Sequence, residues 1–107
     1  MATELPAPVR RAVDAANGGD LDGFLDAFTE TGAVDDSGRT FRGRAAITGW
    51  SDTEFIGKQV TLDVTGVEPA GDTVMITAQV GGNGFNGPSH FAFTVAGDRV
   101  TLMKITG

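Results

Sequence analysis

The spacing of apolar residues changes from a helical to a strand period near the middle of the chain. Segment 9–17 carries apolar residues at the spacing of one helix face and follows two prolines that suit a first helical turn. We predict that this helix ends at Asn17-Gly18-Gly19 and that a second begins after Asp20, a good N-cap, and ends near Thr31-Gly32. The two apolar faces consist of Val9, Ala12, Val13 and Ala16, and of Leu21, Phe24, Leu25 and Phe28.

A hairpin and a third helix are predicted next. The stretch "GAVDDSGRTFRG" has the pattern of a short hairpin that turns at Ser37-Gly38. The stretch "RAAITGW" then predicts a brief helix that brings Trp50 to the core side.

The second half of the chain predicts four strands. Their short connections are typical of antiparallel neighbours, so we expect a meander. Because helices come first and the sheet second, we expect one α+β domain over residues 1–107, with the N-terminal helices packed on one face of a curved antiparallel sheet. The predicted strands are Gln59 to Glu68, Thr73 to Val80, Ser89 to Val95, and Val100 to Thr106.

The loop "GGNGFNG", residues 81–87, contains a G-x-G-x-x-G pattern at Gly82, Gly84 and Gly87. A dinucleotide site needs a helix directly after such a loop, because the helix N-terminus holds the pyrophosphate. Here the segment "SHFAFTV" follows, and its alternation predicts a strand. We therefore interpret the glycines as a wide hairpin turn and expect no nucleotide cofactor.

Composition limits the kinds of site and partner. With no cysteine and one histidine, thiol nucleophiles and zinc ribbons are excluded, and we expect neither a metal nor another cofactor. The net charge of −6 repels phosphates, so nucleic acids and acidic membrane surfaces are not expected partners. No apolar stretch approaches the ~20 residues of a membrane span and the first residues do not resemble a signal peptide, so a cytoplasmic location is expected.

Two stretches carry a family resemblance, "AANGGDLDGFLDAF" at 15–28 and "AVDDSGRTFRGRAAITGW" at 33–50, with "HFAF" at 90–93 and Met103 as further matches. The chain thereby resembles the nuclear transport factor 2-like superfamily, in particular its SnoaL-like and ketosteroid-isomerase-like members. The resemblance implies a cone-shaped half-barrel closed around an apolar pocket, usually built as a homodimer through the sheet. Many such proteins are not catalysts, so the fold alone does not decide the function.

In this resemblance, Asp36 stands at the position of the isomerases' general base, which moves a proton between two carbons of a ketone. From the residues alone, Asp35 and Asp36 equally fit a solvated hairpin whose carboxylates accept turn N–H bonds. Asp35 should in any case point to the opposite face of its strand. Arg39 and its neighbouring arginines fit ordinary surface ion pairs.

The oxyanion donors of the isomerases are not retained. Their donor Tyr corresponds to Ala12 in a chain without tyrosine, and their donor Asp corresponds to Ser89, a much poorer acid. Removing one such donor raises the barrier by roughly 3 kcal/mol in other enzymes. These departures from the isomerases favour a milder reaction than efficient steroid isomerisation, such as a slow isomerisation, a cyclisation or the hydration of an activated substrate.

The candidate pocket residues are large and apolar. Along the third predicted strand, Ser89, Phe91 and Phe93 share the interior face, and His90 lies on the outer face. A small apolar or carbonyl-containing ligand is expected, but the same pattern fits a plain core, and the alternative is a non-catalytic homodimerisation or ligand-binding module. The expected lining is Trp50, Phe55, Phe91, Phe93, Met103 and Ile105.

Overall fold

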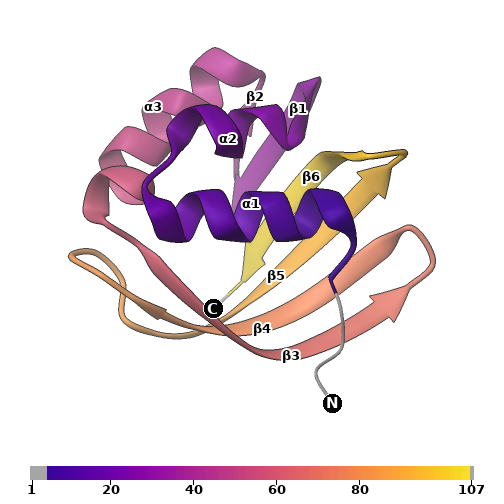
Figure 1. The fold of residues 1–107 in the computed structure, drawn as a ribbon. Coiled ribbons are helices and arrows are strands. Elements are labelled where there is room, and N and C mark those ends of the chain that lie inside the picture. The colour runs from indigo at the N-terminus through magenta and orange to yellow at the C-terminus, as the bar shows by residue number, and fades with distance from the viewer. Residues whose placement is uncertain (1–4, 107) are drawn as a thin grey trace.

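The computed structural model describes residues 5–106 and shows helices on one face of a curved sheet (Figure 1). The helices are α1 (Ala7–Gly18), α2 (Leu21–Asp26), α3 (Arg44–Glu54) and the short 3-10 helix η1 (Ile56–Lys58). The strands are β1 (Phe28–Asp36), β2 (Arg39–Arg42), β3 (Thr61–Ala70), β4 (Thr73–Gly81), β5 (Gly87–Ala96) and β6 (Arg99–Thr106). The predicted α+β fold is confirmed.

The six strands form one open sheet in the order β2-β1-β6-β5-β4-β3. Strands β3 to β6 make the predicted meander, because each pairs antiparallel with the next. The sheet is nevertheless mixed, since β1 runs parallel to β6. A parallel neighbour was not predicted, because β1 and β6 come from opposite ends of the chain.

The second helix is shorter than predicted. Its helical hydrogen bonds end at Ala27, and Phe28 begins a strand where we expected the helix to continue to Thr31-Gly32. The backbone N–H of Val100 donates to the Ala27 carbonyl at 2.7 Å, which starts the pairing with β6. Pairing with β6 gives this segment the hydrogen bonds of a strand in place of those of one more helical turn, and Phe28 is fully buried in the strand.

The hairpin prediction is confirmed at Ser37-Gly38. Both residues have positive φ, 53° and 98°, as a two-residue type I′ turn requires. The Gly38 N–H donates to the Asp35 carboxylate at 2.8 Å, which supports the turn.

The third helix is present but longer than predicted, since it continues past Trp50 to Glu54.

The core lies between α1 and the concave face of the sheet. The predicted apolar face of α1 is buried, and its small Ala12 and Ala16 bring the helix close to the sheet. At the end of this helix, the Asn17 side chain donates to the Leu62 carbonyl at 3.0 Å and accepts from the Leu62 N–H at 2.6 Å. These two bonds attach α1 to the edge strand β3.

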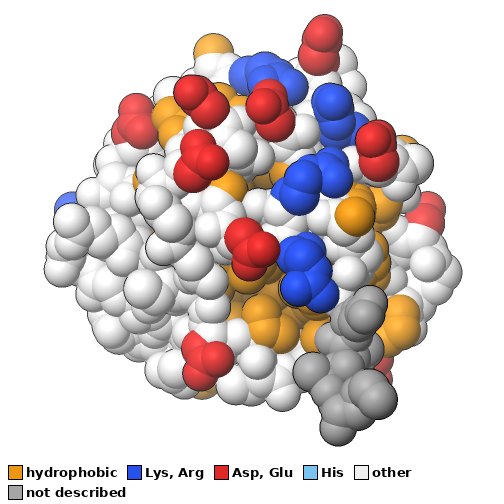
Figure 2. Space-filling model, viewed as in Figure 1, with side chains coloured by type: hydrophobic (Ala, Val, Ile, Leu, Met, Phe, Trp, Pro, Cys, Tyr) orange, Lys and Arg blue, Asp and Glu red, His pale blue; other side chains and the backbone are white. Residues whose placement is uncertain are grey.

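On the helical face of the molecule, basic side chains lie close to acidic ones (Figure 2). Arg44, for example, pairs with Asp26 at 3.3 Å. No helix in the described part of the chain is long and apolar enough to cross a membrane.

Candidate functional site

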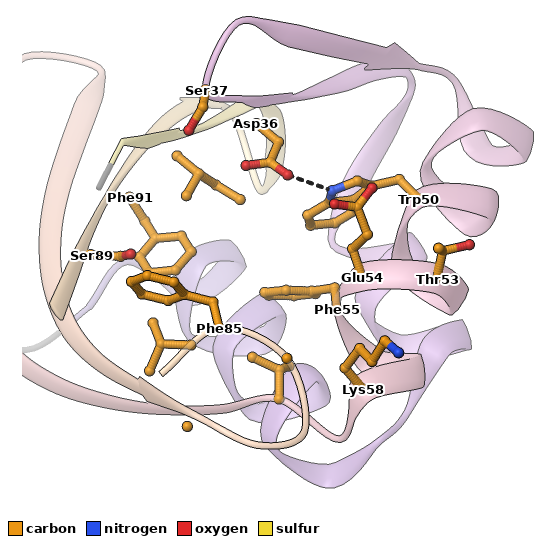
Figure 3. Close-up of a pocket in the computed structure, with 15 residues that line it drawn as sticks. Asp36, Ser37, Trp50, Thr53, Glu54, Phe55, Lys58, Phe85, Ser89 and Phe91 are labelled. Carbon is orange, nitrogen blue, oxygen red and sulfur yellow. Dashed lines mark hydrogen bonds between the residues drawn. The ribbon is translucent and has the colours of Figure 1, made fainter. Parts of the chain in front are cut away.

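A pocket of about 310 Å³ opens beside α3 and η1, at the end of the sheet where the β4-β5 loop lies (Figure 3). Its volume is at the lower end of the range for ligand sites, roughly 300–1,000 Å³. The buried part of the lining is mainly apolar, and the polar residues at its rim are exposed. The apolar lining consists of Trp50, Phe55, Val60, Val80, Phe85, Phe91 and Ile105.

Strand register places Asp36 at this pocket. Asp36 pairs with Arg39 on β2 and with Ile105 on β6, on the face that the helices cover. The adjacent Asp35 pairs with Lys104 and faces the other side of the sheet, because successive strand residues alternate. The Asp36 side chain keeps 21% of its surface exposed.

The two carboxylate oxygens of Asp36 have different surroundings. Oδ2 accepts hydrogen bonds from the Trp50 indole at 3.1 Å and from the Arg39 guanidinium at 2.6 Å. No donor among residues 5–106 contacts Oδ1. Figure 3 shows the first of these bonds as a dashed line, with the other oxygen turned away from it. One oxygen is therefore held by the protein, and the other is available to a ligand.

Arg39 links Asp36 to a second carboxylate at the rim. It donates to both oxygens of Glu54, at 2.9 and 2.7 Å, and its guanidinium lies 5.6 Å from the centre of the Phe41 ring. The hydrogen bonds from Arg39 lower the pKa of Glu54 below its ordinary value, and the bond to Glu54 is the main cause of the raised pKa of Arg39. Asp36 comes from the end of β1, Arg39 from the start of β2 and Glu54 from the end of α3.

Aromatic packing orients the Trp50 ring. The indole stacks on Phe55, with ring centres 4.8 Å apart and planes 25° from parallel, and Phe55 packs in turn on Phe24. Phe41 lies on a second side of the indole, at 6.2 Å. A ring held in this way presents its N–H to Asp36 without a large loss of rotamer entropy.

Ser89 provides a second polar group that has no hydrogen-bond partner among residues 5–106. Only 5% of the residue is exposed, and it lines the pocket from β5. Within the described residues its hydroxyl makes no hydrogen bond. Figure 3 shows it beside Phe85 and Phe91. His90, on the opposite face of the strand, is exposed and bonds to Thr77 at 3.1 Å.

The model of the SnoaL-like domain family matches residues 9–103. The chain belongs to the SnoaL-like domain family. This match covers most of the sequence and confirms the resemblance carried by the two stretches at 15–28 and 33–50. No curated protein matches the chain.

Solved structures share this SnoaL-like fold. A candidate polyketide cyclase from Sinorhizobium meliloti has a TM-score of 0.84 at 23% identity, with 95% of each chain covered. A protein with a ketosteroid isomerase-like fold from Catenulispora acidiphila, solved with trimethylamine, has a TM-score of 0.82 at 25% identity and covers 97% of this chain and 87% of its own. The Δ5-3-ketosteroid isomerase from a Mycobacterium species has a TM-score of 0.78 at 17% identity, with 94% and 90% covered. Similarities at such low sequence identity establish the fold. The activity has to be inferred from the residues of the pocket.

The SnoaL-like domain brings only part of the expected lining to the pocket. Trp50, Phe55, Phe91 and Ile105 line it. Phe93 and Met103 pair with each other two residues further along β5 and β6, are 1% exposed, and lie in the core outside the lining. The sequence did not indicate Val60 and Val80, because the residue before β3 and the end of β4 meet at the pocket only after the sheet has formed.

The glycine-rich loop of the SnoaL-like domain is a hairpin connection, as expected, with β4 before it and β5 after it. Gly82 has a φ of +121°, and a Cβ there would lie 2.6 Å from the Gln59 carbonyl oxygen. The N–H of Asn83 donates to the Lys58 carbonyl at 2.8 Å. These contacts seat the loop against η1, and Phe85, 58% exposed, lines the mouth of the pocket.

Proposed function

We propose that this SnoaL-like domain binds a small, largely apolar carbonyl compound and that Asp36 acts on it as a general base. The observation that carries the proposal is the asymmetry of the Asp36 carboxylate. Trp50 and Arg39 hold Oδ2, and Oδ1 has no donor among the described residues at the wall of a pocket lined mainly by apolar groups. A general base needs such a lone pair within reach of the substrate.

The proposed step conserves atoms and charge. The Asp36 carboxylate takes a proton from the carbon beside the carbonyl and becomes a carboxylic acid, while the electron pair moves to the carbonyl oxygen as an enolate. The acid then returns a proton to the same carbon or to a conjugated one. Related folds include a candidate polyketide cyclase and a ketosteroid isomerase, which supports this class of chemistry.

The reaction should be modest in rate. Ala12 is fully buried and offers no donor where the isomerases have their Tyr, and the chain has no tyrosine. The enolate would therefore receive less stabilisation than in an isomerase with two strong donors. Substrates with an already acidic C–H bond fit this site best.

A deuterium-exchange assay tests the proposal. The probe is 2-tetralone in D₂O, whose α-protons exchange through an enolate and are followed by proton NMR. We expect the wild-type protein to accelerate exchange, and Asp36→Asn to lose about 100-fold of that acceleration, the lower end of a typical general-base contribution. The matched control is Asp35→Asn, which alters a carboxylate on the opposite face of the same strand and should keep the wild-type rate. Equal rates for wild type and Asp36→Asn would reject the base.

A second candidate is a non-catalytic homodimerisation or ligand-binding module. Strands β4 and β5 lie inside the sheet and contain no charged residue, and their outward face exposes Met75 by 38%. This uncharged patch, which Glu68 on β3 and Lys104 on β6 flank, is favourable for contact with a second copy. Sedimentation equilibrium should then show a dimer that Ala92→Lys, on the outward face beside Met75, dissociates. A monomer at high concentration would exclude this dimer.

The cytoplasmic location remains a prediction of the sequence.

A further inference from the structure

An exposed phenylalanine stands at the mouth of the pocket. Phe85 is 58% exposed although its side chain belongs to the pocket lining. Among residues 5–106 the other exposed large apolar side chain is Met75, on the outward face of the sheet. Removing an aromatic ring from water is favourable. An apolar group that covers Phe85 would therefore be bound by it.

The loop that carries Phe85 is attached to the helical side of the pocket. The backbone N–H of Asn83 donates to the Lys58 carbonyl at 2.8 Å, and the Asn83 side chain donates to Gln59 Oε1 at 3.0 Å. Both partners belong to η1 or follow it directly. The first half of the loop is therefore fixed against the element that forms one wall of the pocket.

The second half of the loop folds back on the first. The Asn86 side-chain amide donates to the carbonyls of Gly82 and Gly84, at 3.0 and 3.1 Å. A Cβ on Gly87 would lie 3.3 Å from the tip of the Phe85 ring, so the ring rests against backbone that has no side chain. The loop backbone is thus held at both ends, and Phe85 projects from between the attached residues.

The position of the ring indicates what covers it. In Figure 3, Phe85 lies beside Ser89 and Phe91, and Phe55 lies on the other side of the cavity. The outward face with Met75, which suits a second copy, is on the opposite face of the sheet from Phe91. Phe85 instead continues the apolar lining from the floor of the pocket to its rim. A ligand in the pocket is therefore the occupant that its position favours.

We infer that loop 82–86 caps the pocket and that Phe85 covers the outer end of a bound apolar ring compound. The ligand class rests on the proposed function, whereas capping by Phe85 does not depend on catalysis by Asp36. Because the loop backbone is already held, binding has to order little more than the ring of Phe85. The pocket volume of about 310 Å³ equals that of roughly ten waters at about 30 Å³ each, which suits one or two rings under this cap.

Fluorine NMR tests whether a ligand covers this position. The chain contains no tyrosine, so Phe85→Tyr labelled with 3-fluorotyrosine gives a single fluorine signal. A soluble gadolinium chelate broadens this signal in proportion to its exposure. We expect saturating 2-naphthol to decrease the broadening by about half or more, since the ligand covers a face of the ring. Met75→Tyr with the same label is the matched control, and its broadening should not change with 2-naphthol.

Affinity for 2-naphthol, followed by the fluorescence of the probe, gives a second readout. Phe85→Ala should bind it about three- to tenfold more weakly, the effect of one lost aromatic contact. Phe85→Leu keeps an apolar cover and should recover part of this loss. Met75→Ala removes the other exposed apolar side chain and should bind like the wild type. Phe85 is largely exposed, so these variants should fold as the wild type does.

The outcomes separate capping from the proposed function. Unchanged broadening at Phe85→Tyr, equal affinities of wild type and Phe85→Ala, or no binding of 2-naphthol would overturn the cap. Protection that rises with protein concentration in the absence of 2-naphthol would also overturn it, because a second copy would then cover the ring. Ligand-dependent protection without accelerated exchange in 2-tetralone would reject Asp36 as a base and retain the cap.

Discussion

Replacing Asn17 with alanine should detach the edge strand β3 from α1. The Asn17 side chain satisfies both the N–H and the carbonyl of Leu62, at 2.6 and 3.0 Å. Strand β3 is at the edge of the sheet and, within residues 5–106, pairs with β4 alone, so Asn17 stands where a further strand would otherwise pair. In Asn17→Ala, both backbone groups of Leu62 lose their partner in a partly buried position.

The magnitude follows from these two bonds. A typical hydrogen bond contributes about 1 kcal/mol, so the variant should lose about 2 kcal/mol of its free energy of unfolding. For a domain of about 100 residues, each kcal/mol moves the melting temperature by roughly 4–8 °C. We therefore expect a decrease in Tm of about 10 °C.

Urea denaturation followed by tryptophan fluorescence provides the assay. Trp50 is the sole tryptophan of the chain and is 4% exposed, so its emission reports loss of the core. The matched control is Asn83→Ala, which removes an exposed bond to Gln59 and should change the free energy of unfolding by less than about 0.5 kcal/mol. A loss in Asn17→Ala no larger than that in the control would refute the argument.

Two further predictions concern α3, η1 and the rim. Because Arg39 lowers the pKa of Glu54 in the folded chain, their ion pair stabilises the fold above the ordinary value of 4.5 and this stabilisation is lost as the pH falls. Glu54→Gln should therefore flatten the acid side of a plot of unfolding free energy against pH, and an unchanged slope would contradict it. In Gly57→Ala, the new Cβ would lie 1.7 Å from the Asp52 carbonyl oxygen, so we expect a loss of about 3 kcal/mol in urea denaturation. Gly49→Ala, with open space in α3, should stabilise the fold by up to about 1 kcal/mol, and similar effects of the two would contradict the packing argument.

The sequence by itself determined the features that depend on neighbouring residues. The helical period identified the buried face of α1, and the turn chemistry of Ser37-Gly38 located the β1-β2 hairpin. Strand alternation placed Phe91 and Ser89 inside and His90 outside, as the burial of β5 confirms. Such features are predictable because they arise from chain geometry over a few residues.

Only the tertiary structure decided what depends on distant segments. Phe28 begins a strand because β6, from the other end of the chain, pairs with it. The bond from Trp50 to Asp36, and the link from Arg39 to Glu54, form because α3 lies over the β1-β2 hairpin. Phe91 lines the pocket and Phe93 lies in the core, although both have the same pattern in the sequence. Periodicity specifies the face on which a side chain lies, and the packing of remote elements specifies what it meets there.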